Sequence, residues 1–232
     1  NWLWKISEKI ILWFIRKNQT RGEEGQVLKC YFFITTSRHW WKMWYFKTWP
    51  QIFLQDLTPN ILTNFIFDIG AAGSLSEKLC INDIVCGEYS LEYDVCTSEE
   101  IAKIPDDFKT WTILISKVSS REVLKEFSNL VEKTMGSIIK VGNIASGEKD
   151  VNNKELRQEL HEKLNAIACN WETSSVLKIA QLNGIKSFSF RVITDYADED
   201  MNDDFNANCE KALEIMFPVL NKFIFEGWIK KI

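Results

Sequence analysis

The sequence IKSFSFRVITD at residues 185–195 decides the fold class of this 232-residue chain. Apolar and polar side chains alternate from Ile185 to Ile193, and this period of two residues predicts a β-strand. Gly184 comes directly before it and predicts the end of a helix, because glycine adopts the left-handed conformation without steric cost. The strand carries Asp195 to its carboxyl end. Open α/β sheets bind ligands at that edge, so Asp195 is a candidate functional residue.

Short apolar runs alternate with amphipathic helical patterns from residue 60 onward, which is typical of an α/β domain with a largely parallel sheet. We expect further strands over residues 65–69, 81–86, 111–115 and 137–145. We expect helices over residues 120–134, 154–168, 173–183 and 204–225. Pro218 is expected to bend or break the last helix. The small residues from Gly70 to Gly73 predict a tight turn that a ligand can approach closely.

The composition is that of a globular chain, with 46% hydrophobic residues to form a core, and it predicts one domain over residues 1–232. A net charge of -4 argues against binding to nucleic acid or an anionic membrane, since both attract concentrated positive charge. The sequence contains two histidines, His39 and His161, so a histidine-rich metal site is excluded. His161 lies off the apolar stripe of its expected helix and is interpreted as solvated. The six cysteines lack C-x-x-C pairing, which predicts buried, reduced thiols in a cytoplasmic protein.

The first 50 residues are the hardest to interpret, because they hold seven of the ten tryptophans. The longest uninterrupted apolar run there, residues 10–15, is far shorter than the ~20 residues that a membrane-spanning helix needs. We therefore expect no membrane span in this region. The same run is a candidate first strand.

Three groups of residues, each weak by itself, point to a function when they are taken together. They are residues 70–75 with 81–85, residues 143–147, and residues 170–172 with 191–198. Their order and spacing resemble the nucleoside phosphorylase and nucleosidase superfamily over about residues 64–225. The likeness is strongest to nucleosidases that hydrolyse methylthioadenosine and S-adenosylhomocysteine, with futalosine hydrolase as a near relative.

The resemblance implies a three-layer α/β/α sandwich around a central mixed sheet, of the phosphorylase/hydrolase type. It implies an enzyme that cleaves the N-glycosidic bond of a 5'-substituted adenosine-type nucleoside, without a cofactor or metal ion. It also implies a homodimer. A small-molecule nucleoside is the expected partner.

The resemblance places Asp195 at the position of the general acid and Glu172 at the position of the residue that binds the ribose hydroxyls. The chemistry agrees, because a purine leaves poorly as an anion unless an acid protonates it while positive charge builds on the sugar. An ordinary aspartate, with a pKa of about 3.9, is too strong an acid, so the site has to raise that pKa. The alternatives are a helix N-cap for Asp195 and a first-turn helix acid for Glu172.

Five further residues are implied to bind the substrate, and they are Ala72, Gly73, Val151, Trp171 and Thr194. Trp171 stands where the family usually has methionine, and its indole can offer an apolar wall to the sugar and the base. A core position is the alternative for Trp171. After residue 147 the chain departs from the acid and the aromatic residue that line the family's base pocket.

The choice between hydrolysis and phosphorolysis depends on the nucleophile. Phosphorylases of this superfamily typically place an arginine where this chain has Asp68. A carboxylate there would repel phosphate, which favours water as the nucleophile. The family acid that orients this water is not recognisable here; Glu23 and Glu24 are weak candidates, with a solvated loop as their alternative. A phosphorylase and a noncatalytic nucleoside-binding relative therefore remain as alternative functions.

Overall fold

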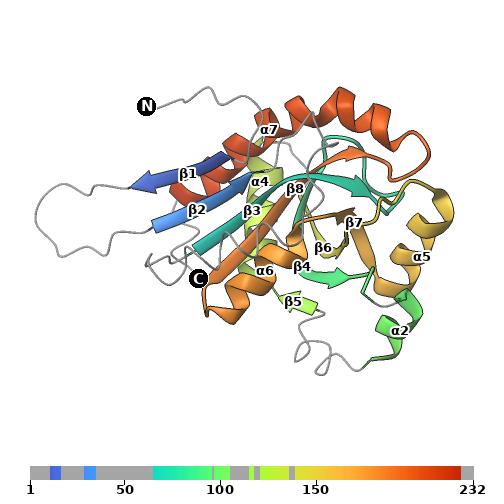
Figure 1. The fold of residues 1–232 in the computed structure, drawn as a ribbon. Helices are drawn as coiled ribbons and strands as arrows, with labels where there is room; N and C mark the ends of the chain where they lie inside the picture. The colour runs from blue at the N-terminus through green and yellow to red at the C-terminus, as the bar shows by residue number, and fades with distance from the viewer. Residues whose placement is uncertain are drawn as a thin grey trace, which may run out of the picture.

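The computed structural model describes residues 11–16, 29–34, 65–95, 97–104, 115–117, 121–135 and 139–225. These residues form a mixed α/β fold around one eight-stranded sheet (Figure 1). The strands are β1 (Ile11–Arg16), β2 (Lys29–Ile34), β3 (Phe65–Ser74), β4 (Ile84–Glu92), β5 (Ile115–Lys117), β6 (Ile139–Ser146), β7 (Ala166–Asn170) and β8 (Lys186–Asp195). The helices are α2 (Ser98–Lys103), α4 (Arg121–Met135), α5 (Lys154–Leu164), α6 (Thr173–Leu182) and α7 (Met201–Phe225).

The sheet is mixed, as the family resemblance implied, and the strand order is β1-β2-β3-β7-β6-β4-β5. Strand β8 pairs in parallel with β3 and antiparallel with β4, so β3, β7, β6, β4 and β8 form a closed ring of pairings. Antiparallel pairs also join β1 to β2, β3 to β7 and β4 to β5. The expectation of a largely parallel sheet was therefore wrong. It rested on helices alternating with strands, a pattern that does not report which strands pair, such as the antiparallel pairs of β3 with β7 and β4 with β8.

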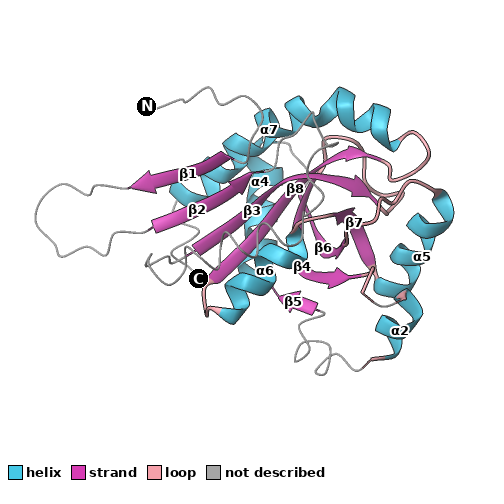
Figure 2. Ribbon diagram, in the orientation of Figure 1, coloured by secondary structure: helices cyan, strands magenta, loops and turns pink. Residues whose placement is uncertain are grey.

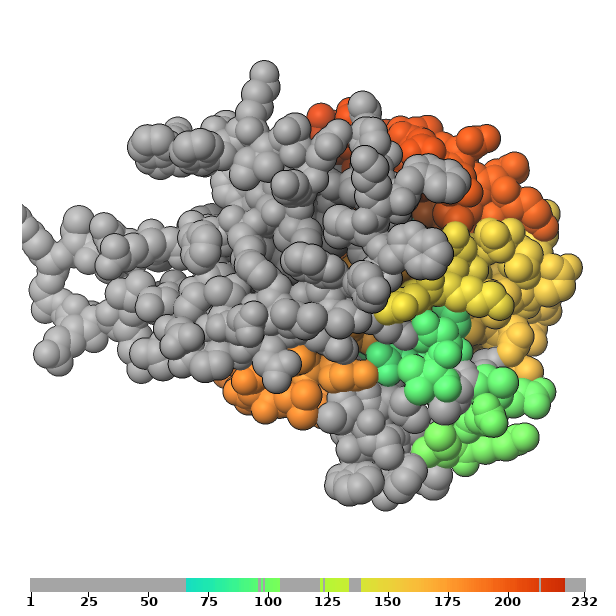
Figure 3. All heavy atoms as spheres, viewed as in Figure 1, coloured from blue at the N-terminus to red at the C-terminus, as the bar shows by residue number. Residues whose placement is uncertain are grey.

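Helices cover the sheet on both sides (Figure 2). An aromatic cluster lies between one side and the helices α4 and α7, and it contains Phe67, Phe127, Phe188, Phe190 and Phe223. Helix α6 packs on the other side through a smaller apolar cluster around Ile66. In the space-filling view, α7, α5 and α2 follow one another along one edge of the molecule (Figure 3). The central strand β8 is thus buried on both of its faces.

Several predicted elements need correction at their ends. The residues from Gly70 to Gly73 form no turn, because β3 runs through them and irregular pairing with β8 occurs between Ala72 and Gly73. Strand β4 begins at Ile84 rather than residue 81, because Asn82 has a φ of 78° and directs the chain into a turn. Of the strand expected over 111–115, the described part begins at Ile115.

The helix expected over residues 154–168 is too long. Helix α5 ends at Leu164, because Asn165 adopts the left-handed conformation with a φ of 50°, and the following residues form β7. The expectation that His161 is solvated is also wrong. His161 is half-buried, and its Nδ1 lies 2.8 Å from the Ala166 carbonyl oxygen. Pro218 lies inside α7 without ending it, and the helix continues to Phe225.

The expected helix end before Gly184 is confirmed, and the expectation of buried cysteines holds for two of the four described. Gly184 has a φ of 64° just beyond α6. Four cysteines lie in the described segments as free thiols; Cys86 and Cys169 are buried, whereas Cys80 is exposed and Cys209 half-buried. Within the segments listed above, no helix combines the length and apolar character needed to cross a membrane. Glu23 and Glu24 lie outside the described residues.

The aromatic cluster predicts where the fold is most sensitive to a cavity. Phe223→Ala removes a fully buried ring that contacts the rings of Phe67 and Phe127. We expect it to lower the free energy of unfolding by about 3–5 kcal/mol in urea titrations. Phe217→Ala, on the same helix but 40% exposed, is the matched control and should cost far less. Equal losses from the two variants would contradict this assignment of the core.

Candidate functional site

Asp195 lies at the end of β8, where three strands meet. Gly73 of β3 pairs with both Asp195 of β8 and Cys169 of β7. A Cβ atom on Gly73 would lie 2.6 Å from the Asp195 Oδ1 atom, so a side chain at this position would collide with the carboxylate. The glycine is therefore required for Asp195 to sit against β3.

Irregular pairing aims the Asp195 side chain. Ala72 pairs with Ile193, whereas the next residue of β3, Gly73, pairs with Asp195, so Thr194 is the extra residue of a β-bulge. Such bulges re-aim side chains and are common beside active sites. Without the extra residue, Thr194 would stand opposite Gly73 and Asp195 would point to the other face of the sheet.

The environment of Asp195 suits a proton donor. Burial raises the pKa of Asp195 from 3.8 to about 6, and the nearby carboxylates of Asp204 and Asp198 also raise it. The Ala197 amide, which donates to Oδ1 over 3.0 Å, and the Thr194 hydroxyl, which donates to Oδ2 over 2.9 Å, lower the pKa and hold the carboxyl group in place. The Thr194 hydroxyl also lies 3.4 Å from the Ala72 carbonyl oxygen, so it keeps an acceptor when Asp195 is protonated.

Glu172 stands between β7 and α6, and its side chain is buried. It occupies the N-cap position of α6 but makes no side-chain capping bond. Its Oε2 instead accepts a hydrogen bond of 3.2 Å from Arg191 Nη1, within an ion pair. The pKa of Glu172 is raised overall, because burial outweighs the lowering effect of the Arg191 guanidinium, and the Asp68 carboxylate raises it further. The alternative of a first-turn helix acid is therefore wrong, since the carboxylate is directed to Arg191 instead of the helix amides.

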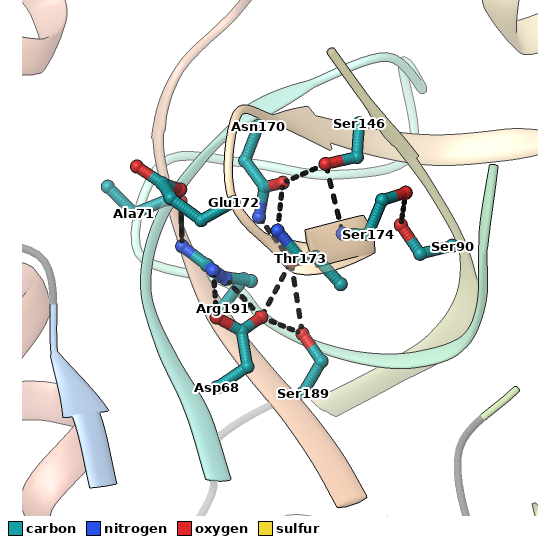
Figure 4. A network of polar contacts seen from close by, with 10 residues as sticks. All are labelled: Asp68, Ala71, Ser90, Ser146, Asn170, Glu172, Thr173, Ser174, Ser189 and Arg191. Carbon is teal, nitrogen blue, oxygen red and sulfur yellow. Dashed lines mark hydrogen bonds and ion pairs between the residues drawn. The ribbon is translucent and has the colours of Figure 1, made fainter. Parts of the chain in front are cut away.

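A buried polar network surrounds Glu172 (Figure 4). Arg191 extends from β8, and its Nε and Nη2 atoms donate to the two oxygens of Asp68 on β3. Asp68 Oδ2 also accepts hydrogen bonds from the hydroxyls of Thr173, over 2.6 Å, and Ser189, over 2.8 Å. Asp68 is thus a fully buried carboxylate with its charge compensated. It does not face the site as the free anion that was expected to repel phosphate.

A second part of the network fixes the start of α6. The Asn170 side chain donates to the Thr173 hydroxyl over 2.6 Å and accepts from the Thr173 amide and the Ser146 hydroxyl. Ser146 in turn accepts from the Ser174 amide over 3.1 Å. These bonds tie the first turn of α6 to the ends of β6 and β7 (Figure 4). Glu172 therefore projects from a braced segment of backbone.

The two candidate catalytic carboxyl groups border the same short stretch of β3. Arg191, which holds Glu172, donates to the Ala71 carbonyl oxygen over 3.3 Å. Asp195 is paired with Gly73, two residues along the same strand. One carboxyl group belongs to an ion pair, whereas the other is surrounded by neutral donors. The ion pair favours the charged form of Glu172, whereas the neutral donors around Asp195 leave it with a pKa of about 6.

The predicted substrate-binding residues occupy different positions around this stretch. Ala72 is buried, and its carbonyl oxygen faces the Thr194 hydroxyl. Val151 is buried in an apolar cluster that also contains Ala197. Trp171 is half-buried directly before Glu172. A substrate contact by these residues, or by Gly73, stays a prediction.

The sequence interpretation missed the roles of Arg191, Asp68 and Thr173. A usable signal was present, because Asp68 interrupts the apolar run of β3, and Arg191 is a charged residue between the apolar residues Phe190 and Val192 of β8. Charged residues inside buried strands need partners of opposite charge.

Among the described residues, no group of three His, Cys, Asp or Glu side chains is placed to hold a metal ion.

Comparisons with known proteins show what the chain is similar to. Residues 61–224 match the family described as the Phosphorylase superfamily. Aminodeoxyfutalosine nucleosidase of Helicobacter pylori is 31% identical over 160 residues, which cover 68% of this chain and 66% of that protein. The 5'-methylthioadenosine/S-adenosylhomocysteine nucleosidase of Thermotoga maritima is 26% identical over 164 residues, covering 69% and 68% of the two chains. The match to the Helicobacter pylori protein thus spans just under two thirds of its length.

Solved structures show the same fold. The native structure of futalosine hydrolase of Helicobacter pylori superposes with a TM-score of 0.67 at 25% identity, over 78% of this chain and 76% of that chain. A 5'-methylthioadenosine/S-adenosyl homocysteine nucleosidase of the same species superposes with a TM-score of 0.68 at 24% identity, over 78% and 77%.

The raised pKa of Asp195 predicts a pH-dependent contribution to stability. A pKa of about 6 in the folded chain exceeds the ordinary 3.8, so the stabilisation is fully present below pH 3.8 and is lost as the pH rises through about 6. Relative to Asp195→Asn, the native chain should therefore lose roughly 3 kcal/mol of unfolding free energy across this window. Urea titrations of both proteins at about pH 4 and 7 measure this loss. A difference that stays constant with pH would show that Asp195 titrates normally.

Proposed function

This chain belongs to the phosphorylase superfamily, and from that premise we propose that it is a purine nucleosidase. Its substrate is a 5'-substituted adenosine-type nucleoside, of the class that includes methylthioadenosine, S-adenosylhomocysteine and aminodeoxyfutalosine. The names of its relatives support this class. The observation that carries the proposal is the pair of unlike carboxyl groups, Asp195 and Glu172, beside one stretch of β3.

Asp195 acts as the general acid. As the N-glycosidic bond breaks, its electron pair moves to the purine, and Asp195 donates a proton to a ring nitrogen so that the base does not leave as an anion. A pKa of about 6 places a useful fraction of Asp195 in the protonated form near neutral pH. Thr194 keeps the carboxyl group oriented in both of its protonation states.

Glu172 acts on the sugar. Its carboxylate accepts hydrogen bonds from the ribose hydroxyls, and these bonds strengthen as the sugar becomes positively charged in the transition state. Arg191 uses one nitrogen to hold one oxygen of Glu172. Water then adds to the sugar carbon, and the proton that it loses passes to solvent while Asp195 takes up a proton again, which completes hydrolysis.

Water is favoured over phosphate as the nucleophile because of how Arg191 is used. Its guanidinium already donates to Asp68, Glu172 and the Ala71 carbonyl oxygen. An anion near it would also meet the charge of both carboxylates. The site therefore favours a neutral nucleophile, whereas a phosphorylase has to attract phosphate.

We propose further that the enzyme is a cytoplasmic homodimer. The family resemblance supports the dimer, and the buried thiols of Cys86 and Cys169 suit a reducing compartment. Sedimentation velocity of the full chain tests the assembly, and we expect a species of twice the 27.1 kDa chain mass at micromolar concentration. A monomer that is fully active would contradict the dimer.

The activity predicts release of adenine in buffer free of phosphate. Methylthioadenosine, S-adenosylhomocysteine and aminodeoxyfutalosine are incubated separately with the protein, and chromatography measures the free base. Added phosphate should not raise the rate, and the sugar should appear without a 1-phosphate group. Asp195→Asn should lower kcat by about 10²–10⁴-fold.

Two results would contradict the proposal. Release that requires phosphate would assign a phosphorylase, and binding without release would assign a noncatalytic relative. Phe217→Ala is the control for a loss of activity caused by substitution and purification alone, because Phe217 is partly exposed on α7.

A further inference from the structure

We propose that Asp68 is a positioning residue that holds Glu172 in its sugar-binding pose through two separate connections, Arg191 and Thr173. This inference rests on the proposed function. Asp68 makes no hydrogen bond or ion pair with Glu172 among the described residues. Apart from the direct effect of its charge on the pKa of Glu172, it reaches Glu172 through these two neighbours.

The first connection is electrostatic and acts on the Glu172 side chain. Asp68 binds two nitrogens of the Arg191 guanidinium, Nε over 3.0 Å and Nη2 in an ion pair, which fixes the plane of that group. The remaining Nη1 then points to Glu172 Oε2 and to the Ala71 carbonyl oxygen. The guanidinium is therefore oriented before Glu172 uses it.

Asp68 also limits how strongly Arg191 binds Glu172. Arg191 gives Glu172 one nitrogen on one oxygen, whereas Asp68 receives the two-pronged contact. Without the Asp68 charge, the guanidinium would be free to turn toward Glu172 and pair with both of its oxygens. Such a pair would compete with the ribose hydroxyls for the same carboxylate.

The second connection acts on the backbone that carries Glu172. Asp68 Oδ2 accepts a hydrogen bond of 2.6 Å from the hydroxyl of Thr173, the residue that follows Glu172. Thr173 is fully buried and is held from its other side by Asn170. Asp68 thus anchors the first turn of α6 to β3, while its first connection anchors the Glu172 side chain.

A purely structural role and a positioning role of Asp68 predict different effects of its substitution on catalysis. Glu92, the last residue of β4, offers a matched comparison, because it is also a buried carboxylate in an ion pair. Its partner is Lys178 of α6, at 2.8 Å. Changing either carboxylate to an amide removes one buried ion pair. A positioning role predicts that the Asp68 change affects catalysis through Glu172, and that the Glu92 change does not.

The experiment is a double-mutant cycle on base release. Asp68→Asn should lower kcat/KM by about 10- to 100-fold, mainly through kcat, because a small displacement of Glu172 weakens a contact that counts most in the transition state. In a Glu172→Gln background the same change should alter kcat/KM less than threefold. Glu92→Gln should stay within threefold of the native chain. Equal losses from Asp68→Asn in both backgrounds, or no loss in either, would overturn the inference.

A second pair of variants covers the case in which Asp68→Asn does not fold. Thr173→Val removes the hydroxyl connection but keeps every charge, and it should lower kcat more than it changes KM. Thr173→Ser keeps the hydroxyl and should restore most of kcat. Loss of kcat in both Thr173 variants, or in neither, would contradict the backbone connection.

Crystal structures separate this inference from the proposed function. If the native chain releases no base from any nucleoside, the proposed function fails, yet the position of Glu172 can still be compared between Asp68→Asn and Glu92→Gln. We expect the Glu172 carboxylate and the Arg191 guanidinium to move in the first variant and to stay in place in the second. An unmoved Glu172 in Asp68→Asn would overturn the inference whatever the activity.

Discussion

The rest of the site depends on the burial of one guanidinium. Arg191 is among the largest fully buried side chains of the described residues, and a buried charge is tolerated when it is paired and its donors are satisfied. Asp68 and Glu172 supply the two carboxylates, from β3 and from the junction of β7 with α6. Because these partners come from separate elements, satisfying Arg191 requires the strands and the helix to meet in one arrangement. The buried charge beside the candidate site is therefore also a condition on the fold.

Two carboxyl groups of similar intrinsic acidity obtain different roles from their surroundings. Glu172 has a guanidinium beside it, which opposes the effect of burial on its pKa. Burial still prevails at Glu172 and leaves its pKa raised. Asp195 has neutral donors and further carboxylates near it, and burial raises its pKa to about 6. The ion pair favours the charged form of Glu172, and a pKa of about 6 leaves part of Asp195 protonated near neutral pH, so the two groups suit different tasks. The ion pair of Arg191 with Glu172 produces this difference between the two sites.

The sequence predicted those features of the site that depend on neighbouring residues. The alternation before Asp195 predicted β8, and the family motif identified Asp195 and Glu172 as candidates. The pairing of Asp68 with Arg191 joins residues 123 positions apart, and no local pattern reports such a contact. The spacing of Leu156, Leu160 and Leu164 fitted a helix that also included Ile167, but a left-handed Asn165 ends α5 first. Local periodicity does not show where the backbone reverses.

Strand β8 makes the core and the site dependent on each other. Phe188 and Phe190 face the aromatic cluster, whereas Ser189 and Arg191 face the polar network. A shift of one residue in its pairing would exchange these two sets, placing a guanidinium among aromatic rings and leaving Asp68 without its partner. Packing of the rings therefore fixes the register that the chemistry requires. The bulge at Thr194 then changes that register locally, so that Asp195 turns toward Gly73 while the residues before it keep their alternation. Regular pairing of β8 with β3 thus positions the residues up to Ile193, and the irregular pairing that follows positions Asp195.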